Sequence, residues 1–116
     1  KTELQKLFNM YGSQATLWNV YGPTECTCIC SAYAISQKDF VDMDMLAPLG
    51  FLAEEFNGLV LDEAGKQVVD GEIGELLLCG SQVAIGYYND AERTAASFLM
   101  NPVTPASGQM CYRTGD

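Results

Sequence analysis

The chain has 116 residues, with 15 acidic and 6 basic side chains, no histidine, a net charge of −9 and 48% hydrophobic residues, which fits one ordinary domain with a modest core. The absence of histidine excludes a Ser-His-Asp triad, an imidazole general base and a histidine-ligated zinc site within the chain. The acidic balance argues against nucleic acid and anionic membranes as partners, because both require an excess of Lys and Arg.

The front of the chain, residues 1–45, predicts an α/β segment. Residues 2–11 carry apolar side chains at helical spacing and predict a helix that ends at Gly12. Residues 16–21 are short, apolar and rich in β-forming side chains, so they predict a buried strand. A second strand is predicted over residues 27–35.

The rear of the chain, residues 46–116, predicts short strands separated by turns. A helix interrupts them, from Asn89 as N-cap to Phe98. The sequence therefore predicts a small, mostly antiparallel, β-barrel-like subdomain behind the α/β front. Its strands are expected over residues 59–61, 75–79, 82–88 and 110–113.

The five cysteines are an odd number, so they cannot all pair within the chain. Cys26, Cys28 and Cys30 alternate, so a strand would carry them on one face, too close in sequence for a low-strain disulfide. This pattern favours small buried thiols and a reducing cytoplasm, with a thiolate metal site as the alternative. No apolar run approaches the roughly 20 residues that span a bilayer, so no membrane partner is expected.

A polar turn comes directly after the first predicted strand, at the edge where α/β sheets meet their ligands. Tyr21 offers an aromatic face for a planar base, and the Asn19 amide can donate and accept hydrogen bonds. Gly22 permits a close backbone approach, Thr24 supplies a hydroxyl, and Glu25 supplies a hard oxygen ligand suited to Mg²⁺. On spacing alone, the same residues favour a tight Gly-Pro turn whose Thr and Glu cap the next element of the chain.

Two later motifs change this balance towards a ligand site. Residues 74–89 read GELLLCGSQVAIGYYN, and residues 112–116 read YRTGD. Behind the YGPTE turn of residues 21–25, in this order and at these separations, they resemble the adenylation domains of nonribosomal peptide synthetases. These domains belong to the adenylate-forming superfamily, together with acyl-CoA synthetases and luciferases. The resemblance runs through essentially the whole chain.

The resemblance implies a nucleotide-binding role for five residues. Tyr21 stacks on the adenine of ATP, and Asn19 bonds the exocyclic amine. Thr24 contacts the α-phosphate and Glu25 helps to hold Mg²⁺, so these two are the expected catalytic residues. Asp116 takes the two ribose hydroxyls.

The resemblance also implies a substrate pocket and a reaction. Val20, Cys28 and Ile29 line the pocket for an amino-acid side chain, and their apolar character suggests a hydrophobic or medium-sized substrate. The amino-acid carboxylate attacks the α-phosphate of ATP, giving aminoacyl-AMP and pyrophosphate. The phosphopantetheine thiol of a carrier protein then takes the acyl group.

Several functional parts of the family are expected outside these 116 residues. They are the phosphate-binding loop, the Asp that binds the amino group of the substrate, the catalytic lysine and the hinged C-terminal domain. We therefore expect a fragment of a larger ligase, inactive by itself, whose partners include the remaining segments of the parent enzyme. Strands that have lost their neighbours expose apolar edges, which favours self-association or swapping.

Three alternatives stay open. The first is a fragment of an acyl-CoA synthetase-type enzyme or of a D-alanine carrier-protein ligase. The second is a non-catalytic acidic interaction domain that keeps the fold without the activity. The third is a thiolate metal module on Cys26, Cys28 and Cys30.

Overall fold

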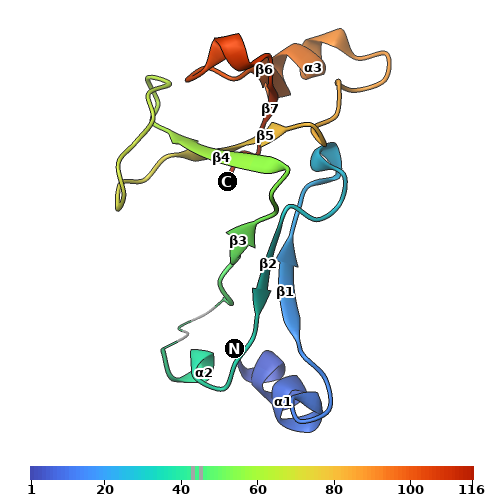
Figure 1. Ribbon diagram of the computed structural model, residues 1–116, viewed down its shortest axis with the longest axis vertical. Helices are drawn as coiled ribbons and strands as arrows, with labels where there is room; N and C mark the ends of the chain where they lie inside the picture. The colour runs from blue at the N-terminus through green and yellow to red at the C-terminus, as the bar shows by residue number, and fades with distance from the viewer. Residues whose placement is uncertain (43, 45) are drawn as a thin grey trace.

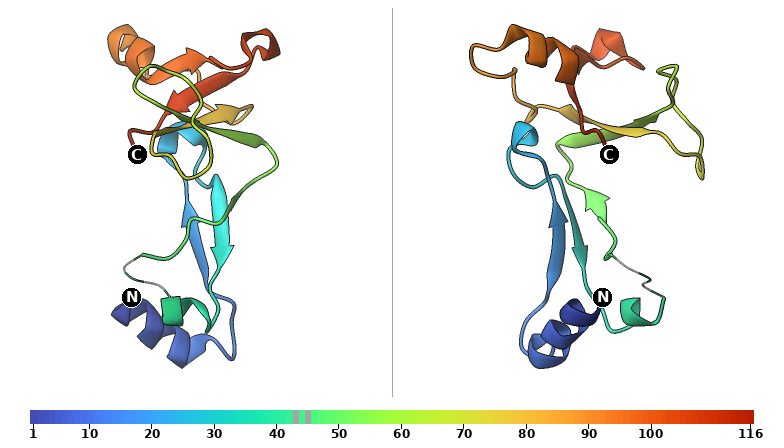
Figure 2. Two further views of the ribbon diagram at one scale, coloured as in Figure 1. Left: turned by 90° about the vertical axis from the view of Figure 1, so that its left-hand side faces the viewer. Right: turned by 180° about the vertical axis from the view of Figure 1, so that it is seen from behind.

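The computed structural model describes residues 1–42, 44 and 46–116, and it consists of two antiparallel sheets arranged along an elongated molecule (Figures 1 and 2). The molecule measures 46 × 32 × 23 Å, and its radius of gyration is 16.7 Å. A compact chain of this length has a radius of gyration of about 13 Å, so much of this chain lies away from any common core. The boundary that the sequence predicts between residues 45 and 46 touches residue 45, which lies outside the described residues.

The front of the chain forms two helices and a three-stranded sheet of order β1-β2-β3. The predicted first helix and its end are confirmed, because the Gly12 backbone N–H caps the helix by donating to the Phe8 carbonyl oxygen at 2.7 Å. Among the described residues, none of the helices combines the length and the hydropathy that a membrane span requires. The elements are α1 (Thr2–Tyr11), β1 (Trp18–Tyr21), β2 (Ser31–Ala34), α2 (Asp39–Asp42) and β3 (Phe51–Leu52).

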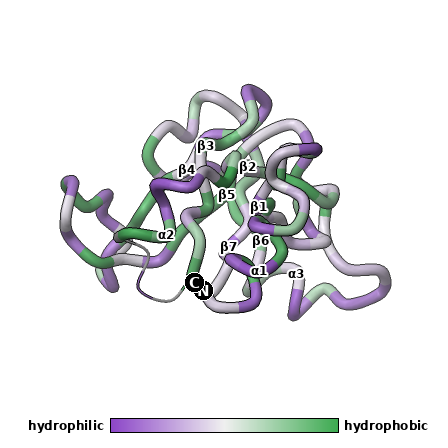
Figure 3. Tube along the Cα trace, turned by 90° about the horizontal axis from the view of Figure 1, so that it is seen from below, coloured by the Kyte–Doolittle hydropathy of each residue, from purple (hydrophilic) through white to green (hydrophobic). Residues whose placement is uncertain are grey.

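The first sheet leaves one apolar face open, so the prediction of a buried first strand is wrong. β1 is an outer strand, and Trp18 and Val20 are 59% and 48% exposed. Val20 pairs with Ala32, which pairs with the 85%-exposed Phe51, so these side chains share a face. Hydrophobic residues are accordingly spread over the elements of both sheets instead of gathering at one centre (Figure 3).

A left-handed turn replaces the start of the second predicted strand. Thr27 and Cys28 have φ angles of 57° and 83°, which strand residues do not adopt, so β2 begins only at Ser31. Cys26 and Cys30 are fully buried, whereas Cys28 is exposed. The prediction that the three cysteines share one face of a strand is therefore wrong, although two of the three thiols are buried as expected.

The rear of the chain forms a four-stranded antiparallel sheet of order β4-β5-β7-β6. The predicted short antiparallel strands are largely confirmed. The barrel-like closure is not, because β4 and β6 are the outer strands and do not pair with each other among the described residues. The elements are β4 (Phe56–Leu61), β5 (Glu75–Gly80), α3 (Ala91–Ser97), β6 (Phe98–Met100), the 3₁₀ turn η2 (Pro105–Ser107) and β7 (Met110–Arg113).

Residues 82–88 form a loop, so the strand predicted there is wrong. Their backbone amides bond to turn partners instead of a neighbouring strand: the Ala84 N–H donates to the Glu25 carbonyl oxygen at 2.8 Å. The next helix is capped by Asp90, whose side chain accepts a hydrogen bond from the Arg93 backbone N–H at 3.0 Å. The predicted cap, Asn89, instead precedes the cap in a left-handed conformation, with φ at 54°.

The second sheet buries a core on each face. One face packs against the β1–β2 turn, because the core there contains Cys26 and Cys30 of that turn together with residues of the second sheet. The turn is thereby docked on the second sheet. The buried residues of the first core are Cys26, Cys30, Phe56, Leu78, Val83 and Phe98, and those of the second are Leu61, Leu77, Cys79 and Cys111.

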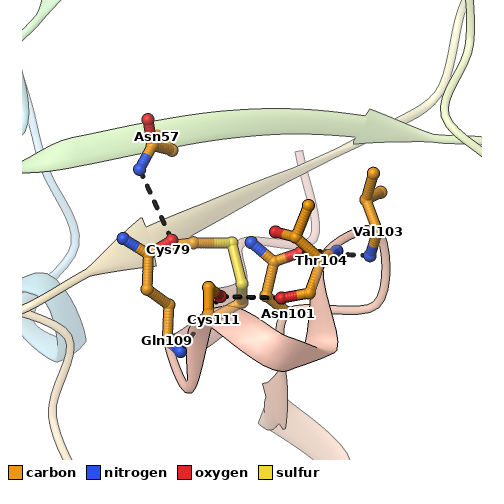
Figure 4. The surroundings of a disulfide bond; sticks show 8 residues. Asn57, Cys79, Asn101, Val103, Thr104, Gln109 and Cys111 are labelled. Carbon is orange, nitrogen blue, oxygen red and sulfur yellow. Dashed lines mark hydrogen bonds between the residues drawn. A yellow bond between two sulfur atoms is a disulfide. The ribbon is translucent and has the colours of Figure 1, made fainter.

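The second core contains a disulfide between Cys79 and Cys111, which lie directly opposite each other on β5 and β7 (Figure 4). The two cysteines are separated by 32 residues, and only the strand register brings them together. This bond is therefore not predicted from the sequence. Beside it, the buried Asn101 side chain accepts hydrogen bonds from the backbone N–H groups of Val103 and Thr104, at 3.0 and 2.9 Å.

We expect a thiol reagent such as DTNB to find one fast-reacting cysteine in the native chain, the exposed Cys28. Burial raises the pKa of Cys26 to about 12 and also raises the pKa of Cys30, so these thiols react only after unfolding. Unfolding without reductant exposes three thiols, and reduction exposes all five. Five reactive thiols in the unfolded, unreduced chain would contradict the Cys79–Cys111 bond.

Candidate functional site

The turn that carries the predicted nucleotide residues lies at the junction of the two sheets (Figure 1). Its backbone is tied to the loop after β5, because the Glu25 carbonyl oxygen accepts a hydrogen bond from the Ala84 N–H at 2.8 Å. The Thr27 hydroxyl donates to the Gln82 carbonyl oxygen at 2.8 Å. These bonds hold the turn between β1 and β2 against the second sheet.

Gly22 is required by a close approach of the chain to itself. A Cβ atom at this position would lie 2.0 Å from the Cys28 carbonyl oxygen and 2.8 Å from the Cys30 nitrogen. The Cys30 N–H donates to the Tyr21 carbonyl oxygen at 2.7 Å in the same place. Gly22 is predicted to permit the close approach of a ligand, and in the structure the backbone of residues 28–30 makes the close approach.

Tyr21 and Asp116 meet across the junction, although 95 residues separate them. The Tyr21 hydroxyl donates to Asp116 Oδ2 at 2.8 Å. Burial, and after it the Asp116 carboxylate, raises the pKa of Tyr21 to about 12, so the phenol stays protonated and remains a donor. The Asp116 backbone is fixed as well, because its carbonyl oxygen accepts from the Leu76 N–H at 3.0 Å.

Glu25 is held by a second tyrosine from the opposite side of the junction. The Tyr87 hydroxyl donates to Glu25 Oε1 at 2.5 Å, and the Arg93 guanidinium lies 3.9 Å from the centroid of the Tyr87 ring. The hydrogen bond from Tyr87 lowers the pKa of Glu25 below its usual value, although burial acts to raise it. The Tyr112 hydroxyl and the positive charge of Arg93 also lower this pKa. Glu25 is therefore an ionised carboxylate at neutral pH.

Asn19 and Thr24 each keep a polar group available for a ligand. The Asn19 side-chain NH₂ donates to the carbonyl oxygens of Ala47 and Pro48, at 3.3 and 2.8 Å. This orients the amide so that its oxygen remains an acceptor without a partner among the described residues. Thr24 is exposed at the start of the 3₁₀ turn η1 (Thr24–Cys26), and its hydroxyl has no hydrogen bond within the described part of the chain.

The three predicted pocket residues stand at the same turn with their side chains exposed. Val20 and Ile29 are 48% and 49% exposed, and Cys28 is also exposed. The backbone contact between Gly22 and Cys28 brings the end of β1 and the 28–29 segment together. The exposure of all three side chains means that a closed pocket here requires a further wall.

No role is predicted from the sequence for Tyr87, Tyr112 or Arg93. Tyr87 and Tyr112 lie within the two later motifs, yet spacing along the chain does not reveal that Tyr87 meets Glu25, 62 residues earlier. One signal was available: a tyrosine in an apolar setting usually finds a partner for its hydroxyl. In a chain with 15 acidic side chains, that partner is readily a carboxylate.

The oxygen donors at the turn are of the kind that Mg²⁺ prefers. Glu25 and Thr24 supply hard oxygen atoms, and a carboxylate has about four lone-pair sites, so Glu25 keeps acceptor capacity beside its hydrogen bond from Tyr87. The described residues contain no group of three His, Cys, Asp or Glu side chains able to hold a metal. Mg²⁺ at this turn would therefore bind through one carboxylate together with water and substrate phosphates. Cys26, Cys28 and Cys30 do not form such a group either, so the described residues do not support the alternative of a thiolate metal site.

Comparison with known sequences gives a family match and close relatives. The AMP-binding enzyme family matches residues 1–88. The chain is similar to a protein named D-alanine--D-alanyl carrier protein ligase from Lacticaseibacillus rhamnosus, with 41% identity over 103 residues, which is 89% of this chain and 19% of the relative. The ligase of the same name from Streptococcus pyogenes serotype M5 is 38% identical over 97% of this chain and 20% of the relative. The chain thus spans about a fifth of the length of these relatives.

Solved structures of nonribosomal peptide synthetases share the fold. A holo four-domain synthetase bound to AMP and glycine superposes with a TM-score of 0.79 at 37% identity, covering 97% of this chain and 8% of that one. A holo synthetase protein with adenylation and PCP domains, bound to a vinylsulfonamide inhibitor, superposes with a TM-score of 0.82 at 32% identity. It covers 99% of this chain and 20% of that one.

We expect Gly22→Ala to destabilise the chain by about 3 kcal/mol or more, because the new methyl group would overlap backbone atoms that cannot move aside. Gly58→Ala is the matched control, since its closest contact is the flexible end of the Leu52 side chain, 2.8 Å away. Urea unfolding monitored by circular dichroism measures both variants. Equal losses in the two variants would show that the close approach at Gly22 is not a constraint.

Proposed function

Because the chain belongs to the AMP-binding enzyme family, we propose that it is a segment of an adenylate-forming ligase that activates an amino acid and loads it onto a carrier protein. The similarity to ligases named for a D-alanyl carrier protein supports this proposal. The similarity to synthetases with adenylation and PCP domains supports it as well. The relatives are about five times longer, so the whole enzyme would contain further segments on which the activity depends.

The observation that carries the proposal is the contact between Tyr21 and Asp116. In adenosine the base is bonded directly to the ribose, so a ring that stacks on adenine and a carboxylate that binds the ribose hydroxyls must be neighbours. The structure brings these two side chains to hydrogen-bond distance, 2.8 Å. Asn19 lies two residues before Tyr21 on β1, on the same face of the strand, with its amide oxygen available to the exocyclic amine.

The phosphate end of the nucleotide would lie at Thr24 and Glu25. The Thr24 hydroxyl would donate to an oxygen of the α-phosphate, and Glu25 would hold Mg²⁺, which supplies charge neutralisation for the phosphates when it is bound. An amino-acid carboxylate oxygen attacks the α-phosphorus, the bond to pyrophosphate breaks, and aminoacyl-AMP forms. The carrier's phosphopantetheine thiol then attacks the acyl carbon and AMP leaves. In both steps these residues orient the reacting groups.

The exposed apolar side chains support two further parts of the proposal. Val20, Cys28 and Ile29 would form one wall of the amino-acid pocket, and other segments of the enzyme would close it. The open face with Trp18 and Phe51 would pack against those segments or, in their absence, against a second copy of the chain. The net charge of −9 supports a ligase without nucleic-acid or anionic-membrane partners. The cytoplasmic location stays a prediction from the free thiols, and the Cys79–Cys111 disulfide weighs against it, because such bonds are rare in reducing compartments.

The test is ATP–pyrophosphate exchange by the full-length protein with a panel of amino acids that includes D-alanine. We expect exchange with at least one of them, and then loading of a holo-carrier protein but not of free coenzyme A. The 116 residues alone should show no exchange. Asp116→Asn should raise the KM for ATP about tenfold or more, because a charged acceptor for the ribose hydroxyls is lost.

Asp70→Asn is the control, since Asp70 is exposed and outside the junction, and it should leave the KM for ATP unchanged. Coenzyme A as the acceptor would favour the acyl-CoA synthetase alternative. A full-length protein that does not bind Mg-ATP would favour the non-catalytic interaction domain. An unchanged KM in Asp116→Asn would contradict the assigned ribose site.

A further inference from the structure

Tyr87 is restrained on three sides by neighbours that hold its ring in one orientation. Its backbone N–H donates to the Thr94 hydroxyl of α3 at 2.9 Å. The Arg93 guanidinium covers the ring face at 3.9 Å from the centroid, and the Phe98 ring meets it edge-on at 5.4 Å with an interplanar angle of 73°. The Tyr87 hydroxyl therefore points to a fixed place.

That place is the Glu25 carboxylate. The Tyr87 hydroxyl lies 2.5 Å from Glu25 Oε1, and the Glu25 backbone is held by Ala84 at 2.8 Å. A glutamate side chain has three rotatable bonds, and ordering it on ligand binding costs conformational entropy. Here the hydrogen bond orders the side chain beforehand, while the carboxylate keeps further lone pairs for a ligand.

We propose that Tyr87 is a positioning residue, which Arg93 and Thr94 of α3 hold against Glu25 so that the carboxylate is preset for metal–nucleotide binding. This inference rests on the proposed function, because it takes Glu25 to be the residue that binds Mg²⁺. Helix α3 contributes no side chain to the predicted ligand contacts. Through Tyr87, it would nevertheless fix the position of Glu25 at the phosphate end of the site. In a purely structural role, the Tyr87 hydrogen bond would only stabilise the β1–β2 turn and would have no separate effect on metal binding.

The test is Tyr87→Phe in the full-length protein, with Tyr88→Phe as the matched control. Tyr88 is the neighbouring tyrosine, fully exposed and without a hydrogen bond in the described part of the chain. Mn²⁺ replaces Mg²⁺ as the probe, and its binding is measured by electron paramagnetic resonance in the presence of a non-hydrolysable ATP analogue. Tyr87→Phe should weaken Mn²⁺ binding about tenfold, as expected for the loss of a partner that orients a metal ligand. Tyr88→Phe should leave it unchanged.

Binding of the ATP analogue in the presence of EDTA distinguishes a specific effect on the metal ligand Glu25 from a general loss of structure in the variant. If Tyr87 presets a metal ligand, metal-free nucleotide binding changes less than about twofold in Tyr87→Phe, since the substitution keeps the packed ring and removes only a hydroxyl that makes none of the proposed nucleotide contacts. Equal losses with and without metal would overturn the proposal in favour of the structural role. Unchanged Mn²⁺ binding in a natively folded Tyr87→Phe would overturn it outright.

Arg93→Met supplies a second variant in case Tyr87→Phe does not fold. Arg93 is exposed on α3, so its replacement leaves the core intact. Loss of the cation over the ring should weaken Mn²⁺ binding about two- to fivefold, and no change would overturn the proposal.

Glu25→Gln separates this inference from the function on which it rests. If Glu25→Gln leaves Mn²⁺ binding unchanged, the assignment of the metal to Glu25 fails. If it weakens Mn²⁺ binding and Tyr87→Phe does not, only the positioning role fails.

Discussion

Two tyrosine–carboxylate hydrogen bonds cross the junction between the sheets in opposite directions. Tyr21 of the first sheet donates to Asp116, three residues after β7, and Tyr87 of the loop after β5 donates to Glu25 on the β1–β2 turn. Each bond takes its donor from one side of the junction and its acceptor from the other. The four side chains therefore keep their places only while the sheets stay docked. Docking in turn depends on the buried thiols of the turn and on the close approach that Gly22 permits.

The two hydrogen bonds also explain how a chain with a net negative charge could bind a triphosphate. A net charge of −9 repels phosphate, and both carboxylates of the junction would add to that repulsion. A phenol donor on each carboxylate fixes where the charge lies, so that Asp116 can face neutral ribose hydroxyls and Glu25 can face a cation. A single acidic surface is thereby divided into a ribose end and a metal end. The proposed function requires this separation, and the geometry supports it.

Features that depend on residues close together in the sequence were predicted correctly, whereas features that depend on residues far apart in the sequence were not. The helix ending at Gly12 and the strands β4, β5 and β7 were predicted, because apolar periodicity and turn residues are local signals. The left-handed turn at Thr27 and Cys28 was missed, since a β-like composition does not reveal a positive φ. The proposed nucleotide-binding residues were predicted from the motif resemblance. Their contacts with Tyr87 and with each other could not be derived, because each pair is 62 or 95 residues apart and only sheet docking joins them.

The hydrogen bond between Tyr21 and Asp116 forms the ribose end of the proposed nucleotide site. A double-mutant cycle on AMP binding tests it most directly, with Tyr21→Phe, Asp116→Asn and the double variant measured by calorimetry in the full-length protein. Tyr21→Phe keeps the stacking ring and removes only the hydroxyl that reaches Asp116. We expect a coupling free energy of about 1 kcal/mol or more between the two positions. Effects that add to within about 0.3 kcal/mol would contradict it.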